Sequence, residues 1–206
     1  MSDVVELRRI ATLCEDALGQ PDRAQRARQL ADTIDAGIRS AGVVSHPACG
    51  EVFAYEVDGY GSFYFMDDAN VPSLLSLPYL GYCDAEDPIY RRTRAALLSR
   101  HNPFYSEGAA GRGIGGPHVG VGHIWPMSIT VRAITSVDEH EIRDCLAQLV
   151  VTHAGTGFMH ETFWKDDARR FTRRWFGWAN SLFGDLILEL HDRRPDLLAS
   201  WTSAAG

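Results

Sequence analysis

The chain has 206 residues, of which 45% are hydrophobic and 23% charged, and its formal net charge at pH 7 is -7. This length allows a sizeable core, and this composition excludes global disorder. The negative charge provides no electrostatic footprint for nucleic acid or for an anionic membrane, so a neutral ligand fits better.

The sequence carries no signal for secretion or for a membrane span. Its first residues lack the basic start, apolar run and cleavage site of a signal peptide, and no apolar run is long enough to cross a bilayer. The expected location is the cytoplasm. The cysteines are scattered without a C-x-x-C pair, which favours free thiols over a zinc knuckle or a disulfide scaffold.

The first forty residues have the apolar spacing of two helices. One apolar face runs through residues 2–18 and is ended by Gly19 and Pro21, and a second covers residues 27–38. Two helices with a short link predict a helical hairpin.

An aromatic and β-branched stretch follows, between Glu51 and Met66. Its segments "EVFAYEV" and "SFYFM" are separated by "DGYG", which predicts a short β-hairpin. A loop and a short helix near Pro72 are expected next. Asp87 followed by Pro88 is typical of a helix N-terminus.

Residues 101–126 predict a long loop rich in glycine and proline. A loop of this length inside a compact domain is usually functional or disordered, and its histidine and aromatic content favours function.

The last third of the sequence predicts three further helices. The first is "PMSITVRAIT", the second starts at a capping box of Ser136 and Glu139, and the third spans residues 172–191. Trp175 and Trp178 fall on one face of the third helix, where we expect them in the core. The predicted fold class is therefore mainly α: stacked helical hairpins with one small β-hairpin and long functional loops.

Three groups of residues are candidates for chemistry. Glu161, beside His160, is either a general base or a glutamate that favours a helix N-terminus, and local sequence does not decide between these roles. Asp67 and Asp68 are adjacent acids, so at most one is expected to face a given ligand while the other caps or closes a turn.

The third group lies in the long loop and contains His118, His123 and Trp125. Its "GRGIGG" segment does not predict a nucleotide site, because no strand precedes it and no βαβ unit surrounds it. A metal site that combines these histidines with His160 and Glu161 is disfavoured, because no H-E-x-x-H or comparable spacing supports it.

Five segments together resemble one known family. They are "YEVDGYGSFYFMDDANVPSLLSLPYLGY", "NPFYSEG", "GIGGPHVGVGHIWPMSI", "TGFMHETF" and "FTRRWFGWANSLFGDLIL". In this order they resemble the C-terminal half of glycoside hydrolase family 125, the metal-independent exo-α-1,6-mannosidases. The resemblance implies an (α/α)6 toroid and hydrolysis of terminal α-1,6-linked mannose with inversion, without a metal or other cofactor.

The resemblance also implies roles for individual residues. Glu161 in "MHE" matches the general base of the family, and six further residues fall in motifs placed around the sugar: Asp67, Asp68, Asn70, His118, Trp125 and His160. The expected partner is a mannose-containing oligosaccharide or glycan.

One part of the family pattern is missing from this sequence. The general acid of the family belongs to an "RPSDDA" stretch ahead of the first helix, and no such stretch occurs here. We therefore expect residues 1–206 to form one portion of the catalytic domain, weakly active or inactive alone, that needs a complementary N-terminal segment or self-associates. The alternative is a non-catalytic carbohydrate-binding or interaction module derived from the same fold.

Overall fold

The computed structural model describes the backbone of residues 1–205 and the side chains of residues 1–201. Its α-helices are α1 (Ser2–Asp16), α2 (Pro21–Gly37), α3 (Leu77–Leu80), α4 (Pro88–Leu97), α5 (Pro126–Ile134), α6 (Glu139–Thr152), α7 (Gly177–Arg193) and α8 (Pro195–Ala205). Its strands are β1 (Val43–His46), β2 (Gly50–Phe53), β3 (Glu56–Val57), β4 (Phe63–Tyr64), β5 (Tyr105–Glu107), β6 (Arg112–Ile114), β7 (His123–Ile124), β8 (Thr162–Trp164) and β9 (Asp167–Thr172). Within these residues the fold is mainly helical, with small antiparallel sheets, as predicted.

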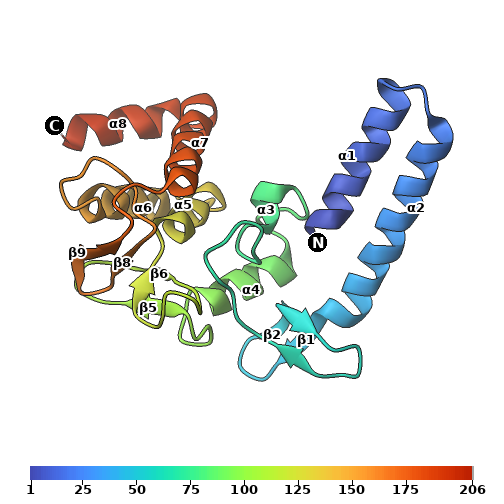
Figure 1. Ribbon diagram of the computed structural model, residues 1–206, viewed down its shortest axis with the longest axis horizontal. Helices are drawn as coiled ribbons and strands as arrows, with labels where there is room; N and C mark the ends of the chain where they lie inside the picture. The colour runs from blue at the N-terminus through green and yellow to red at the C-terminus, as the bar shows by residue number, and fades with distance from the viewer. Residues whose placement is uncertain (206) are drawn as a thin grey trace.

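Helices α1 and α2 form the predicted hairpin and project from the rest of the molecule (Figure 1). Their facing sides are lined by small buried residues, among them Ala11, Ala24 and Ala27, which allow the two helices to pack closely. A π-helical turn, Ile38–Gly42, then leads into β1. Within residues 1–205 no helix is both long and apolar enough to cross a bilayer.

Two hairpins occupy the stretch for which one was predicted. The β3–β4 pair flanks the "DGYG" turn as expected, but Gly50–Phe53 pairs with the upstream strand β1 instead. Helix α4 packs against this upstream hairpin: the N–H of Phe53 donates to the hydroxyl of Thr93 at 2.8 Å. The expected N-terminus of α4 is confirmed, because the Asp87 carboxylate accepts the N–H groups of Ile89 and Tyr90.

Helix α5 lies at the centre of the C-terminal half, where α6 and α7 pack against it (Figure 1). Almost every residue of this short helix is buried, which fits its apolar sequence "PMSITVRAI". Trp125 is the residue directly before α5, so the central helix fixes its position.

Three details of the predicted C-terminal elements are wrong. The N-cap of α6 is Asp138, which accepts the N–H of His140, whereas the Ser136 hydroxyl binds Glu141 in place of a capping box. The last long helix begins at Gly177, since the residues up to Thr172 form β9. Trp175 and Trp178 are 60% and 49% exposed rather than buried: with α7 starting at Gly177, Trp175 lies before the helix and Trp178 in its first turn.

Candidate functional site

Glu161 lies directly before β8, where the neighbouring strand fixes its backbone. Its N–H donates to the carbonyl of Thr172 at the end of β9, at 3.2 Å. Its carboxylate pairs with the guanidinium of Arg173, whose Nε lies 3.3 Å away. Glu161 retains only 9% of its surface, so the carboxylate lies just below the surface of the molecule.

Arg173 has an unusual backbone conformation. Its φ is +44°, in the left-handed region that residues with a side chain enter at a cost of about 1–2 kcal/mol. Such strain often occurs at functional positions, where the surrounding structure holds it. Here the turn directs the guanidinium toward Glu161 and over the ring of Phe176, 5.6 Å from the ring centroid.

A series of rings continues from Phe176 into the long loop. Trp125 meets Phe176 edge-on at a centroid distance of 5.8 Å and meets His118 edge-on at 5.1 Å. We call Glu161, Arg173, Phe176, Trp125 and His118 the acid–aromatic cluster. It joins residues from three separate segments of the chain.

Trp125 has an unsatisfied polar group. Its indole N–H is buried and has no hydrogen-bond partner among the residues that the structure describes. Leaving a buried donor unpaired costs about 1–3 kcal/mol, so this N–H favours binding of a group with an acceptor oxygen. A sugar hydroxyl offers such an oxygen.

Asp68 lies next to the cluster, on the other side of Gly116. A Cβ atom placed on Gly116 would be 3.7 Å from the Cβ of Asp68 and 3.5 Å from the ring of His118. The Asp68 carboxylate accepts both the backbone N–H and the side-chain amide of Asn70, each at 3.0 Å. Asp68 and Asn70 are both partly exposed and act as one unit beside the rings.

The close approach of the backbone at Gly115 explains why this position is a glycine. Its N–H donates to the carbonyl of Phe104, and its carbonyl accepts the N–H of Ala69, which follows Asp68. A Cβ atom at Gly115 would overlap the carbonyl oxygen of His123. Only glycine allows the three segments to approach this closely.

Asp67 is the buried member of the acidic pair. It is fully buried, and its carboxylate accepts the N–H groups of Leu74 and Leu75 at 3.0 and 2.8 Å. Burial raises the pKa of Asp67 to about 8, against these two hydrogen bonds, which favour the charged form. Because Asp67 has no surface to offer a sugar in this structure, we assign it to holding the loop that presents Asp68.

His160 is likewise fully buried. Its Nδ1 lies 2.8 Å from the carbonyl of Arg174 and its Nε2 lies 3.1 Å from the carbonyl of His153, while its ring stacks on Phe171. In either tautomer of the neutral ring, one N–H donates to one of these carbonyls and the other nitrogen faces the second carbonyl. His160 has no free polar atom for a sugar, and we assign it to anchoring the segment that carries Glu161.

The disfavoured metal set does not assemble. His160 uses both nitrogens on backbone carbonyls, and the Nδ1 of His123 lies 3.0 Å from the hydroxyl of Thr162. Among the described residues, the one group of three or more histidine, cysteine or acidic side chains close enough to share an ion is His46, Cys49 and His101.

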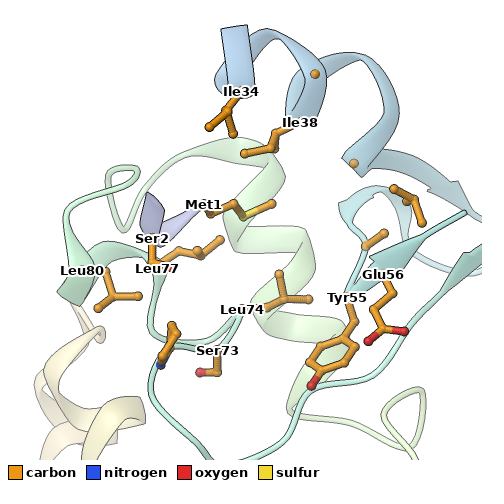
Figure 2. Close-up of a pocket in the computed structure, with 15 residues that line it drawn as sticks. Met1, Ser2, Ile34, Ile38, Tyr55, Glu56, Ser73, Leu74, Leu77 and Leu80 are labelled. Atoms are coloured by element: carbon orange, nitrogen blue, oxygen red, sulfur yellow. The ribbon is translucent and has the colours of Figure 1, made fainter. Parts of the chain in front are cut away.

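A cavity of about 470 Å³ lies elsewhere, between the start of α1, the end of α2 and the segment around Leu74 (Figure 2). Its labelled side chains are mostly apolar, with Tyr55 and Glu56 at one side. The sugar-site candidates are not among its lining residues.

Sequence reasoning missed two members of the acid–aromatic cluster. Phe176 lies between Trp175 and Trp178, which the sequence predicts to be in the core, and no local pattern singles out Arg173. The "TRRWF" segment holds an arginine pair next to aromatic residues, but only the left-handed turn selects Arg173 to face Glu161.

Comparison with known proteins identifies a matching family and individual relatives. The family described as metal-independent alpha-mannosidase (GH125) matches residues 1–188. The Meiotically up-regulated gene 157 protein of Schizosaccharomyces pombe is 52% identical over 196 residues, which cover 95% of this chain and 38% of that protein.

A solved structure from Streptococcus pneumoniae superimposes with a TM-score of 0.85 at 37% identity, over 93% of this chain and 46% of the other. It is described as a metal-independent alpha mannosidase in a non-productive complex with alpha-1,6-mannobiose. The chain thus spans less than half the length of each of these two relatives. On the match over most of its length, the chain belongs to the family of metal-independent α-mannosidases, glycoside hydrolase family 125.

Proposed function

We propose that this chain carries the water-activating part of an active site that hydrolyses terminal α-1,6-linked mannose with inversion. In this proposal Glu161 is the general base, and Asp68, Asn70, His118 and Trp125 contact the sugar. The substrate is a mannose-containing oligosaccharide or glycan, in line with the α-1,6-mannobiose complex described for the pneumococcal relative.

The acid–aromatic cluster is the observation that carries the proposal. It combines a slightly exposed carboxylate, flat rings of the kind that pack against the apolar face of a pyranose, and the unpaired N–H of Trp125. The carboxylate is the group that an inverting glycosidase requires on the side of the attacking water, and the rings and the N–H suit a sugar bound beside it.

Inversion also needs a carboxylic acid that protonates the leaving oxygen, about 6.5–9.5 Å from the base. We infer that this acid comes from the part of the family fold that the present chain does not match, since the chain covers 46% of the pneumococcal structure. We also propose that a complementary N-terminal segment completes a closed (α/α)6 toroid. Residues 1–206 would then form one portion of this catalytic domain.

The test joins this chain to the N-terminal portion of a family member and measures hydrolysis of α-1,6-mannobiose. The Glu161→Gln change should lower kcat by roughly 10²–10⁴-fold while mannobiose still binds, because glutamine cannot take a proton from water. Proton NMR should show β-mannose as the first product. The chain alone should be slower than the completed protein by about 100-fold or more.

The matched control is Glu107→Gln, which changes an exposed glutamate on β5 and should leave kcat unchanged. Equal activity of the two variants would remove Glu161 from the mechanism. A completed protein that binds mannobiose without cleaving it, and equally well after Glu161→Gln, would instead support the carbohydrate-binding module.

A further inference from the structure

His46, Cys49 and His101 bring three potential metal ligands together outside the acid–aromatic cluster. One donor atom from each lies within 4.8 Å of the other two. Ligands of one tetrahedral zinc ion, bound at about 2.0–2.3 Å, lie roughly 3.5 Å apart, so small side-chain rotations would bring these atoms into range.

The two ends of the β1–β2 turn supply His46 and Cys49. His46 is the last residue of β1, Cys49 directly precedes β2, and the N–H of Cys49 donates to the carbonyl of His46 at 3.2 Å. Two ligands separated by two residues on a tight turn are typical of zinc sites. Cys49 is a free thiol that is only partly buried.

His101 reaches the turn because α4 is fixed on the same hairpin. The guanidinium Nε of Arg92 in α4 donates to the carbonyl of Glu51 in β2 at 2.8 Å. After α4, the N–H of His101 donates to the hydroxyl of Ser99 at 3.3 Å. The rings of His46 and His101 meet edge-on at 5.3 Å, so the folded chain already holds the histidines together.

We propose that His46, Cys49 and His101 bind one zinc-class cation, which cross-links the β1–β2 turn to the loop after α4. Two imidazoles and a thiolate suit Zn²⁺ and disfavour Mg²⁺ or Ca²⁺, which prefer oxygen ligands. A water would complete the tetrahedron. The ligands lie on different elements from Glu161, so this site braces the fold and takes no part in sugar hydrolysis.

The proposed zinc cross-link would also restrain the loop that presents Asp68. Asn102, next to His101, accepts the N–H of Asp67 at 3.3 Å and donates to the carbonyl of Asp67 at 3.1 Å. Fixing His101 therefore restrains the backbone one residue before Asp68.

Metal binding also has a local reporter. The N–H of Ala48 donates to Nδ1 of His46 at 3.2 Å. A neutral imidazole has one lone pair, so a metal either takes that of Nδ1 or binds Nε2 while the proton moves to Nδ1. Both routes end this hydrogen bond, and the amide resonance of Ala48 should shift on zinc addition.

The experiment titrates the full chain, freed of metal by a chelator, with ZnCl₂ and follows binding by calorimetry and the Ala48 amide by NMR. We expect one zinc per chain, a shifted Ala48 resonance and a raised melting temperature. His46→Asn, Cys49→Ser and His101→Asn should each weaken binding by roughly tenfold or more, since even loss of an outer-shell partner costs about 10–100-fold. Cobalt(II) should give a thiolate charge-transfer band that Cys49→Ser removes.

His140→Asn and Cys83→Ser are the matched controls, a histidine and a cysteine outside the group, and should bind zinc as the unchanged chain does. Circular dichroism checks that every variant is folded. Absence of stoichiometric binding, or equal weakening by the controls, would overturn the proposal. Neither result would bear on Glu161, because no step measures hydrolysis.

Discussion

Glu161 and His160 are neighbours in the sequence with different surroundings. The carboxylate of Glu161 meets an exposed arginine at the surface, whereas the imidazole of His160 lies between two backbone carbonyls and a stacked ring. The same contrast separates Asp68 from the buried Asp67. At both places the motif pairs one residue that can meet a ligand with one that fixes the backbone.

The anchoring role of His160 predicts a loss of stability in His160→Phe. Phenylalanine can keep the stack on Phe171 but removes both ring nitrogens, so the carbonyl of Arg174 loses its 2.8 Å contact. We expect the free energy of unfolding in urea to fall by about 1–3 kcal/mol. His140→Phe, at an exposed position, should change it by less than about 0.5 kcal/mol. An unchanged free energy of unfolding in His160→Phe would refute the anchoring role of His160.

Sequence could identify the candidate acids but not their orientation. Family motifs mark Asp67, Asp68, His160 and Glu161, yet burial is set by contacts with distant segments, such as the hydrogen bonds between Asp67 and Asn102. The His46, Cys49 and His101 group gave no signal either. Its third member lies more than fifty residues from the others and reaches them only through the packing of α4.

Glu141 joins three helices at the scale of elements. From α6, its carboxylate pairs with Arg94 of α4 and Arg132 of α5, each at 2.7 Å, and also accepts the hydroxyl of Ser136. Burial alone would raise the pKa of Glu141, but the bonds from Arg94, Ser136 and Arg132 outweigh it and lower the pKa to about 2.

Glu141→Gln should therefore destabilise the chain in a pH-dependent way. The pKa of Glu141 is lower in the folded state than its ordinary 4.5, so its contribution is complete above pH 4.5 and is lost as the pH falls toward 2. At pH 7 we expect a loss of about 3 kcal/mol, because two partly buried arginines lose their counter-charge. Urea unfolding at several pH values measures both effects.

The control is Glu139→Gln, on the same helix, whose carboxylate pairs with Arg194 at 3.5 Å and is exposed. It should cost less than about 1 kcal/mol. If the two variants lost the same stability, or if the effect of Glu141→Gln did not shrink between pH 4.5 and 2, the proposed role of Glu141 in joining the three helices would be wrong.

Local signals predicted the helices better than the strands. The Asp87–Pro88 start of α4 and the helical hairpin follow from short-range patterns, and both are confirmed. The pairing of β2 with β1 and the strand at 167–172 depend on partners that periodicity does not reveal. In the stretch from Phe171 to Phe176, aromatic residues on a strand and a turn resemble one face of a helix.

At the scale of the whole molecule, the main feature is the projecting α1–α2 hairpin. It extends away from the remaining helices (Figure 1), and four of its large apolar side chains are about half exposed: Ile10, Leu13, Leu18 and Leu30. Exposed apolar surface of this kind favours association. We expect the isolated chain to form concentration-dependent oligomers through this hairpin.

Multi-angle light scattering over a range of concentrations measures this association. Ile10→Glu with Leu13→Glu should shift the chain toward the monomer, because charge replaces apolar surface one helical turn apart. Thr33→Glu adds a negative charge at an exposed polar position of α2 and should leave the oligomers unchanged. A stable monomer of the unchanged chain at all concentrations would contradict the expectation.

The close approach at Gly115 has a consequence for how the site responds to a ligand. The segments of Ala69, Phe104 and His123 meet at this one residue, without room for a methyl group. The loops that carry Asp68, His118 and Trp125 are therefore coupled and cannot adjust one at a time. If the proposed site binds a sugar, this side of it would be a preformed rigid wall, and selectivity would then depend on the ligand's shape rather than on closure of a lid.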